Sequence, residues 1–242
     1  MKQLGIIGFG QFGQFMAAHL APFFDISVCD VRDRTGEAAG IGVEFDSFEK
    51  AAGSEIVVFA TPLSNFETVL KDAVPFLQKG ALCIDVCSVK LKPIRLMREI
   101  LPENVEIIGT HPLFGPQSGR KGIEGLRIAF CPERTSQAEA VRGFLGDQLK
   151  LRVLKRSPEE HDREMAHVQA LTHFVARALA ELHVEESELA TVSYEELMRA
   201  ARLVSEDSPE LFQTIEAGNP FAESKRKAFI EKLIEIEKRI GK

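Results

Sequence analysis

Three short segments carry the residues of this chain that could do chemistry. Their order along the chain is Gly8-Phe9-Gly10-Gln11-Phe12-Gly13, then Asp85-Val86-Cys87-Ser88-Val89-Lys90, then His111-Pro112-Leu113-Phe114-Gly115-Pro116. The first has the spacing of a glycine turn that receives a dinucleotide. A histidine can take a proton from an alcohol while hydride leaves the same carbon for a nicotinamide, and a nearby hydroxyl can fix the imidazole ring. Together the three segments predict an NAD(P)-linked dehydrogenase with a histidine base.

The glycine turn directly follows a predicted strand over 4–7 and opens a predicted helix over 11–23, which is the context that the dinucleotide fingerprint requires. Gly8 would permit the tight turn, Gly10 would let the backbone approach the pyrophosphate, and Gly13 would allow helix and strand to pack closely. The phosphates would meet unpaired N–H groups at a helix N-terminus. The turn residues expected at the cofactor are Gly8, Phe9, Gly10, Gln11, Phe12 and Gly13.

The end of the second predicted strand bears on the choice of cofactor. Asp30 there would accept hydrogen bonds from the ribose hydroxyls and repel a 2′-phosphate, which favours NAD. Arg32 and Arg34 favour NADP, since an arginine just past this strand can bind that phosphate. We expect NAD, with NADP as the alternative. Thr61-Pro62 ends another strand and could line the nicotinamide ribose, although a plain strand terminator explains it equally well.

Strands and helices alternate over residues 1–155. Predicted strands cover 4–7, 26–30, 55–61, 81–86, 105–109, 127–131 and 151–154, and predicted helices cover 11–23, 66–77, 91–101 and 136–149. Continuous apolar strands between amphipathic helices indicate an α/β fold whose parallel sheet is covered on both faces. Residues 1–155 are therefore predicted to form a Rossmann-type dinucleotide-binding domain. Ser88 and His111 would end successive strands at its carboxyl edge, where such sheets bind ligands.

The strands stop after Lys155. Ser157-Pro158-Glu159-Glu160 predicts a helix start, with Ser as N-cap, Pro at the first position and acids in the first turn. A long helix is predicted over 157–184, and further helices over 194–205, 209–216 and 222–240. These helices make a thin core, so we expect an all-α domain over 156–242 that packs on the first domain, on a second subunit, or on both.

The composition is that of an ordinary globular protein, with 45% hydrophobic and 27% charged residues among 242. The net charge of −6 and the lack of a basic stripe argue against nucleic acid as a partner. No apolar run approaches the roughly 20 residues of a membrane span. Met1-Lys2-Gln3 runs straight into the first strand, without a signal peptide, so we expect a cytoplasmic protein. The cysteines, which we interpret as small buried hydrophobes and not metal ligands, are Cys29, Cys83, Cys87 and Cys131.

Four motifs carry a family resemblance. They are GFGQFG at 8–13, DVCSVK at 85–90, HPLFGPQSG at 111–119 and HDREMAHVQALTHF at 161–174. In this order, over nearly the whole chain, they resemble the prephenate/arogenate dehydrogenase family of tyrosine biosynthesis. The first domain also resembles plant arogenate dehydrogenases. The helical part is more similar to the dehydrogenase domain of bifunctional chorismate mutase–prephenate dehydrogenases.

The resemblance implies roles for particular residues. His111 matches the family's catalytic histidine, and Ser88 matches the serine that assists it. His173 matches a substrate-site histidine, and Arg202 falls where the prephenate enzymes place an arginine for a substrate carboxylate. Phe212 stands where the bifunctional enzymes have a tyrosine, which removes one polar contact. The resemblance also implies that the helical domain forms a homodimer.

The long helix and Lys90 offer further candidates. At about 100° per residue, one face of the helix presents Asp162, Gln169, His173 and Arg177, and the opposite face presents Val168, Leu171, Val175 and Leu182. A polar stripe is equally typical of a solvated face, but Gln169 is a candidate for substrate binding beside His173. Lys90 could hold an acidic substrate through its charge. For His161, which follows two acids near a helix start, a purely structural role is the alternative to a role in the site.

The predicted reaction is oxidative decarboxylation of prephenate to 4-hydroxyphenylpyruvate, with arogenate as the alternative substrate. Another β-hydroxyacid dehydrogenase would share the architecture, but those enzymes usually rely on a lysine in the helical domain, and the long helix has none on its polar face. A non-catalytic dinucleotide sensor would need neither Ser88 nor His111. The expected partners are the small-molecule substrate and a second copy of the chain.

Overall fold

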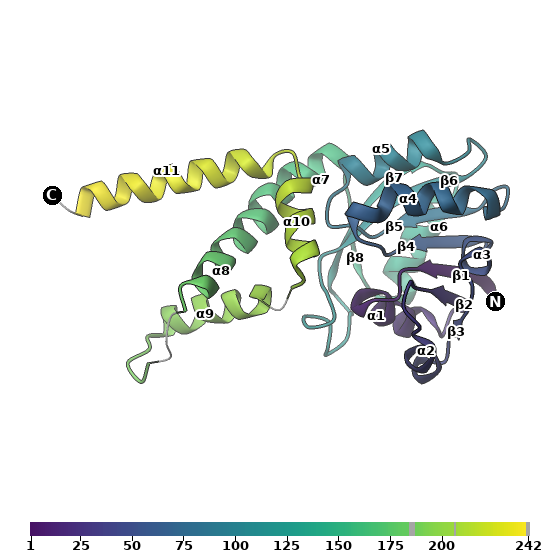
Figure 1. The fold of residues 1–242 in the computed structure, drawn as a ribbon, viewed down its shortest axis with the longest axis horizontal. Helices are drawn as coiled ribbons and strands as arrows, with labels where there is room; N and C mark the ends of the chain where they lie inside the picture. The colour runs from purple at the N-terminus through teal and green to yellow at the C-terminus, as the bar shows by residue number, and fades with distance from the viewer. Residues whose placement is uncertain (184–186, 206, 241–242) are drawn as a thin grey trace. The chain divides into compact units, whose positions relative to one another are not determined.

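The protein is described by a computed structural model over residues 1–183, 187–205 and 207–240. It divides into two compact units, Met1–Glu159 and Glu160–Lys242, where the sequence places the boundary at Lys155. The first unit is the α/β unit and the second is the helical unit (Figure 1).

One eight-stranded sheet forms the centre of the α/β unit, in the order β3-β2-β1-β4-β5-β6-β7-β8. The strands are β1 (Lys2–Ile7), β2 (Phe24–Cys29), β3 (Glu44–Phe45), β4 (Ile56–Phe59), β5 (Leu82–Asp85), β6 (Glu106–Pro112), β7 (Arg127–Arg134) and β8 (Arg152–Lys155). The strand order reverses between β1 and β4, which flank each other at the middle of the sheet. In open α/β sheets a ligand binds outside the carboxyl ends of the strands at such a switch point.

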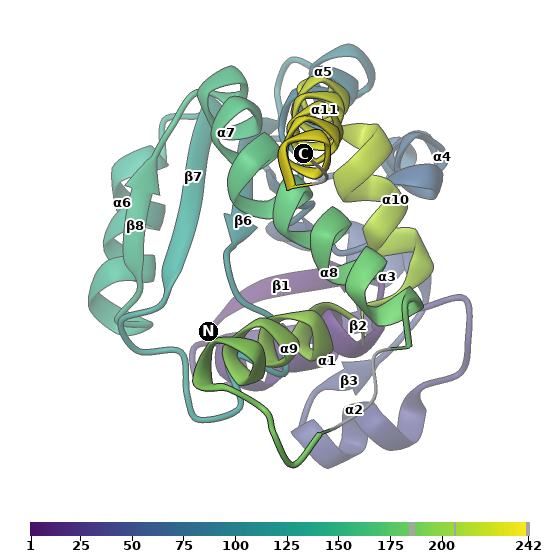
Figure 2. The ribbon, with the colours of Figure 1, turned by 90° about the vertical axis from the view of Figure 1, so that its left-hand side faces the viewer.

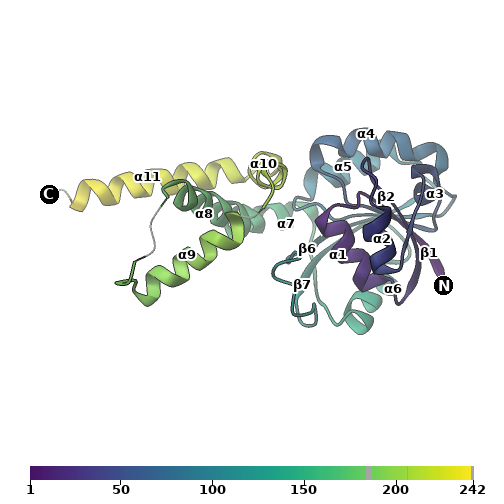
Figure 3. The same ribbon diagram turned by 60° about the horizontal axis from the view of Figure 1, so that its bottom comes forward.

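Helices cover both faces of this sheet, which confirms the predicted fold class (Figure 3). One face carries α3 (Phe48–Ala52), α4 (Leu63–Ala73) and α5 (Leu91–Ile100), and the other carries α1 (Gln11–Leu20), α2 (Thr35–Ile41) and α6 (Ala138–Gly143). Phe66 of α4 and Met97 of α5 are fully buried against the first face, and Ala17 of α1 is fully buried against the second. Burying a side chain as large as Phe or Met stabilises the fold by about 1.5–3 kcal/mol.

The sheet departs from the predicted all-parallel arrangement at β7, which runs antiparallel to β6. Residues 113–126 between the two strands contain no helix, so the chain returns without the helical crossover that joins parallel neighbours. β8 then pairs parallel to β7 after α6 and a π-helical turn, Phe144–Gln148. The short elements α2, β3 and α3 were not predicted, because none is long enough to show a period in the sequence.

The helical unit contains α7 (Pro158–Met165), α8 (Leu171–Glu181), α9 (Val192–Ser205), α10 (Pro209–Gly218) and α11 (Ala222–Ile240) (Figure 2). The single helix predicted over 157–184 is interrupted by a π-helical turn, Ala166–Ala170, which separates α7 from α8. The predicted faces are therefore wrong in part. Asp162 is fully buried, whereas Val168 and Leu182 are 55% and 70% exposed. A wide turn shifts the register of the residues beyond it, and such turns are frequent at functional sites.

None of the described helices is long and apolar enough to cross a membrane. Cys29, Cys83, Cys87 and Cys131 are all buried and carry free thiols, as expected of small hydrophobic residues. Burial raises the pKa of Cys29 and of Cys83 to about 12, so both stay protonated and unreactive at neutral pH.

Candidate active site

The register of the sheet brings the predicted site residues of the α/β unit to one edge. A single row of pairing across β2, β1, β4, β5 and β6 contains Cys29, Ile7, Phe59, Asp85 and Gly109. The predicted residues lie one to three positions beyond this row: Asp30, Gly8, Thr61, Ser88 and His111. Because these five strands are parallel, their carboxyl ends meet at the same edge, where a ligand of an open α/β sheet binds.

The glycine turn combines two tightly packed positions with one open position. Gly8 has a φ of +102°, in the left-handed region, and a Cβ there would lie 2.5 Å from the carbonyl oxygen of Ala60. A Cβ at Gly13 would lie 2.2 Å from the carbonyl oxygen of Gly8. A Cβ at Gly10, by contrast, would meet nothing within 4 Å. The turn therefore packs closely on the sheet and leaves space above Gly10, where a phosphate could approach the backbone.

The N-terminus of α1 and the side chain of Thr61 also fit a dinucleotide. Gly10 is the N-cap of α1 and has no side chain to accept from the first-turn N–H groups, which leaves a positive helix end beside the open space. The hydroxyl oxygen of Thr61 is buried and has no hydrogen-bond partner among the described residues. A buried hydroxyl without a partner is costly, so a ligand that bonds to it would stabilise this edge.

Asp30 closes the turn from the end of β2. Its Oδ2 accepts a hydrogen bond from the Phe9 N–H at 2.7 Å, and its Oδ1 accepts one from the Arg32 N–H at 3.1 Å. A carboxylate has about four acceptor positions, so both oxygens can still accept from ribose hydroxyls. Arg34 is paired with Glu37 at 2.7 Å, and Arg32 is exposed. Arg32 is thus the better placed of the two arginines to meet a 2′-phosphate.

His111 lies on β6, one residue before its end, and is only 4% exposed. Its neighbour on β7 is Ala129. Ser88 is half-buried in the short segment between β5 and α5. The hydroxyl of Thr110 donates to the carbonyl oxygen of Asp85 at 2.8 Å, which ties the end of β6 to the end of β5. The Ser88 hydroxyl and the His111 imidazole therefore belong to neighbouring strand ends that are hydrogen-bonded to each other.

Lys90 differs from its expected role. Its side chain is completely buried, its ammonium forms an ion pair with the equally buried Asp85, and it donates to the carbonyl oxygen of Thr110 at 2.6 Å. The sequence suggested that the charge of Lys90 could hold an acidic substrate, and this burial argues against that role, since an ammonium paired with Asp85 is not presented to solvent. Lys90 instead joins the segment that carries Ser88 to the strand that carries His111.

Asp85 is the functional neighbour that the sequence reasoning did not assign. Burial raises its pKa, and the charge of Lys90 opposes that rise. Its Oδ1 also accepts from the Cys87 N–H at 3.0 Å, while its Oδ2 is buried and has no partner among the described residues. The signal was available, because a carboxylate at the end of an apolar strand needs a cation, and Lys90 is five residues away.

The helical unit positions the remaining candidates. His173 lies on α8 with its side chain 12% exposed, and its Nδ1 is 3.6 Å from Oδ2 of Asp207. Burial and the charge of Arg177 lower the pKa of His173 to about 4, so its imidazole is neutral at pH 7 and this contact is not an ion pair. Gln169 is half-buried in the π-helical turn, and Arg202 is exposed on α9.

His161 makes a buried contact with its neighbour Asp162. Its Nδ1 is 2.8 Å from Oδ1 of Asp162, and both side chains are at most 1% exposed. The backbone oxygen of Asp162 accepts from the side-chain amide of Asn219 at 2.8 Å, which ties the start of the unit to the segment before α11. This buried network packs α7 within the helical unit.

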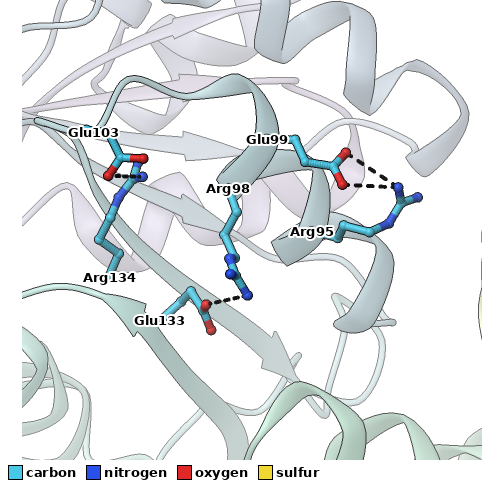
Figure 4. A pocket seen from close by; sticks show the side chains of 6 residues that line it. All are labelled: Arg95, Arg98, Glu99, Glu103, Glu133 and Arg134. Carbon is cyan, nitrogen blue, oxygen red and sulfur yellow. Dashed lines mark hydrogen bonds and ion pairs between the residues drawn. The ribbon is translucent and has the colours of Figure 1, made fainter.

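A cavity of about 520 Å³ lies elsewhere on the α/β unit (Figure 4). Its walls are Arg95, Arg98, Glu99, Glu103, Glu133 and Arg134. Three ion pairs across it join Arg95 to Glu99, Arg98 to Glu133, and Arg134 to Glu103. Three arginines and three glutamates line it, so the cavity carries no net charge to attract a charged substrate. Among the residues that the structure describes, no group of acids, histidines and cysteines could hold a metal ion.

Two domain families match this chain. The nucleotide-binding domain of prephenate dehydrogenase matches residues 21–144, and the dimerization domain of prephenate dehydrogenase matches residues 157–242. The chain belongs to the prephenate dehydrogenase family. This membership confirms the resemblance that the four sequence motifs carried.

The curated relatives of this family member include both arogenate and prephenate enzymes. Arogenate dehydrogenase 1, chloroplastic, of Arabidopsis thaliana is 32% identical over 234 residues, which cover 91% of this chain and 36% of the relative. A probable arogenate/prephenate dehydrogenase of Methanocaldococcus jannaschii is 32% identical over 207 residues, which cover 81% of this chain and 46% of the relative. The chain thus spans about half the length of these relatives or less.

Solved structures of the family share the fold. Prephenate dehydrogenase from A. aeolicus, in complex with hydroxyphenyl propionate and NAD⁺, has a TM-score of 0.78 at 21% identity and covers 99% of this chain and 91% of its own. Synechocystis arogenate dehydrogenase has a TM-score of 0.71 at 18% identity and covers 99% and 93%. At these identities the likeness establishes the architecture alone.

Proposed function

We propose that this family member is an oxidoreductase that converts prephenate to 4-hydroxyphenylpyruvate by oxidative decarboxylation, coupled to reduction of NAD. The observation that carries the proposal is the sheet edge itself. There Gly8 at the start of the glycine turn, Asp30, Ser88 and His111 lie one to three residues beyond a single row of strand pairing. A proton acceptor and a dinucleotide turn at one edge are what the oxidation of an alcohol requires.

The glycine turn, Asp30 and Thr61 are the residues that would hold the cofactor. When bound, a nicotinamide dinucleotide supplies the hydride acceptor. Asp30 supports NAD, because a carboxylate at the end of β2 accepts from two ribose hydroxyls and repels a 2′-phosphate. Arg32 beside it keeps NADP as the alternative, and a probable prephenate dehydrogenase [NADP(+)] of Schizosaccharomyces pombe, 29% identical over 74% of this chain, is among the relatives.

His111 is proposed as the base. Its imidazole accepts the proton of the ring hydroxyl at C4 of the substrate as hydride leaves the same carbon. Ser88 is proposed to hydrogen-bond to that hydroxyl and so orient it toward His111. The ring then loses its carboxylate as carbon dioxide and becomes aromatic, which makes the step effectively irreversible. The residues therefore mainly position the reactants and accept one proton.

The helical unit is proposed to contribute substrate binding and dimerisation. His173, Gln169 and Arg202 are the substrate-binding candidates, with Arg202 pairing with a substrate carboxylate. A homodimer is supported by the match to a dimerization domain and by exposed apolar side chains along α11: Ile230, Leu233, Ile234, Ile236 and Ile240. Exposed apolar stripes of this kind mark interaction surfaces. Sedimentation equilibrium over a range of protein concentrations tests the dimer.

Arogenate is the second candidate substrate, because two chloroplastic arogenate dehydrogenases of Arabidopsis thaliana each match 91% of this chain at 32% identity. Arogenate carries an amino group where prephenate carries a keto group, and its oxidation by the same residues would yield tyrosine.

The deciding experiment measures initial rates of nicotinamide reduction with prephenate or arogenate, each with NAD or NADP. The fastest of the four combinations identifies substrate and cofactor together. His111→Asn, measured in parallel, should lower kcat by at least a hundredfold while the Kd for NAD stays near the wild-type value. Absence of turnover in all four combinations, with NAD still bound, would contradict the proposed function.

A further inference from the structure

A second arginine of the helical unit lies beside the predicted substrate-site histidine. Arg177 follows His173 by four residues on α8, so the two side chains share one face of the helix. The carbon centre of the Arg177 guanidinium is 5.0 Å from the centre of the Phe212 ring on α10. Asp207, just before α10, approaches His173 at 3.6 Å. Arg177, His173, Asp207 and Phe212 form what is called here the α8–α10 cluster.

Two polar atoms of the α8–α10 cluster are buried without a hydrogen bond. They are Nδ1 of His173 and Nε of Arg177, and neither has a partner among residues 1–183, 187–205 and 207–240. Buried donors and acceptors are nearly always paired, so an unpaired one in a native structure calls for a physical reason. Here two of them are one helical turn apart. A polar ligand that reaches this face would satisfy both.

Arg177 is the cation of the α8–α10 cluster and can bind an anion. The imidazole of His173 beside it is neutral, and the carboxylate of Asp207 is 3.6 Å from that imidazole. The guanidinium carbon lies over the Phe212 ring, a cation–π contact that uses none of the N–H groups in the guanidinium plane as hydrogen-bond donors. That planar set of donors matches the two oxygens of a carboxylate.

We propose that Arg177 binds the substrate carboxylate that is retained in the product, the one on the side chain, with His173 donating or accepting a hydrogen bond beside it. This inference rests on the proposed function for the identity of the substrate. The substrate carries two carboxylates, and Arg202 is already a candidate for one of them. Arg177 supplies the second cation that such a dianion needs.

The side-chain carboxylate suits Arg177 better than the ring carboxylate does. The ring carboxylate loses its charge as carbon dioxide departs, so a rigid bidentate arginine on it would stabilise the ground state more than the transition state. The side-chain carboxylate keeps its charge throughout the reaction. The Arg177 guanidinium, held by the Phe212 ring, can bind this side-chain carboxylate equally in the ground state and the transition state. It would thereby position the substrate ring for the reaction.

The test compares Arg177→Gln and Arg177→Lys with Arg199→Gln, an exposed arginine on α9 that serves as the matched control. Arg177→Gln should raise KM for the accepted substrate about 10- to 100-fold, as expected for the loss of a charge-assisted hydrogen bond, and leave the KM for NAD unchanged. Arg177→Lys should recover only part of this, because an ammonium lacks the planar donor set. Arg199→Gln should match the wild type.

A binding titration separates recognition from turnover. The probes are 3-(4-hydroxyphenyl)propionate and its uncharged analogue 3-(4-hydroxyphenyl)propan-1-ol, titrated by calorimetry with saturating NAD. Arg177→Gln should weaken the propionate about 10- to 100-fold and leave the alcohol unchanged. Its Tm should fall by no more than about 4 °C, because Nε of Arg177 has no hydrogen bond to lose in the described chain and the contact with Phe212 is worth about 1 kcal/mol.

Equal weakening of both probes, a Tm lowered by clearly more than about 4 °C, or an unchanged KM would each overturn the proposal, as would a wild-type protein that binds neither probe. The proposed function can fail separately. Suppose that the wild type turns over neither prephenate nor arogenate, yet binds the propionate more tightly than the alcohol, and that Arg177→Gln removes this difference. That result would refute the proposed reaction but support the carboxylate site at Arg177.

Discussion

Replacing Lys90 by Met tests whether the buried ion pair with Asp85 supports the candidate active site. Both side chains are 0% exposed, and the ammonium also donates to the backbone of Thr110 at 2.6 Å. The Met side chain is similar in length and apolar, so Lys90→Met changes the charge with little change in volume. It leaves the Asp85 carboxylate buried without its cation. Breaking a buried pair in this way costs about 3–5 kcal/mol.

The loss should depend on pH, in a direction fixed by Asp85. Burial raises the pKa of this carboxyl, and removing Lys90 removes the main opposing influence. In Lys90→Met the folded-state pKa then lies above the unfolded value of about 3.9, and between the two the folded state binds more protons than the unfolded state. Stability must therefore fall as pH rises through this window, by up to about 1.4 kcal/mol per pH unit. Below pH 4 most of the deficit should disappear, because a protonated Asp85 needs no cation.

Urea unfolding monitored by circular dichroism from pH 4 to pH 8 measures this effect in the wild type, Lys90→Met and the double variant Asp85→Asn/Lys90→Met. The double variant removes the buried charge and should recover part of the stability at pH 7. Arg95→Met is the matched control. Its pair with Glu99 is about 60% exposed, so its unfolding free energy should stay within about 0.5 kcal/mol of the wild type.

Two results would refute the reasoning about Lys90. One is a Lys90→Met protein as stable as the wild type at pH 7, which would mean that Asp85 is not charged in the native fold. The other is a deficit that is the same at pH 4 and pH 7, which would trace the loss to packing. Because the pair joins the segment of Ser88 to the strand of His111, the variant should also lower kcat while the Kd for NAD changes little.

Three further outcomes are expected. Gly13→Ala should weaken NAD binding in a fluorescence titration at least tenfold, because its Cβ would lie 2.2 Å from the Gly8 carbonyl oxygen and force the turn apart. Asp30→Ser should raise the ratio of kcat/KM for NADP to that for NAD at least tenfold, since the carboxylate that repels a 2′-phosphate is gone. His173→Gln should flatten the pH dependence of urea unfolding between pH 6.5 and 4. The pKa of His173 is lowered from 6.5 to about 4, so the folded wild type binds fewer protons than the unfolded chain and loses stability as pH falls, by about 3 kcal/mol in full.

The α/β unit was predictable because its signals are local and redundant. Apolar strands, amphipathic helices and the glycine turn each indicate the same fold, and the parallel register then fixes which strand ends meet. The position of Ser88 and His111 at this edge was predictable by this route, since a residue just past a buried strand of a parallel sheet lies at the ligand edge. The antiparallel β7 was missed, because nothing in the sequence marks the absence of a helical crossover over 113–126.

Lys90 was misassigned for a different reason. The sequence shows that a lysine follows a strand, but whether its ammonium faces solvent depends on a partner brought near by the fold. Asp85 is that partner, and Thr110 completes the contact from the next strand. Periodicity carries no information on such pairing, whereas the rule that a buried carboxylate requires a cation would have indicated it.

The helical unit was harder to predict because a single π-helical turn changes which side chains share a face. A uniform helix places Asp162 with His173, yet Asp162 is fully buried with His161, and the solvent-exposed positions include Val168. His173 and Arg177 escape this error, since both lie on α8, beyond the turn, where regular spacing resumes. The pairing of these two is thus the part of the helical prediction that depends only on local geometry.

The two units also differ in whether substitutions near their candidate site residues should impair catalysis. The proton chemistry proposed for His111 depends on strand ends tied by Asp85, Lys90 and Thr110, and a shift there would misplace the reacting atoms. Recognition of a keto or amino side chain needs only a different polar group near an anchored carboxylate. If Arg177 is that anchor, substitutions around it on α8 and α10 should change the preference for prephenate over arogenate through KM. Substitutions at the sheet edge should lower kcat for both substrates alike.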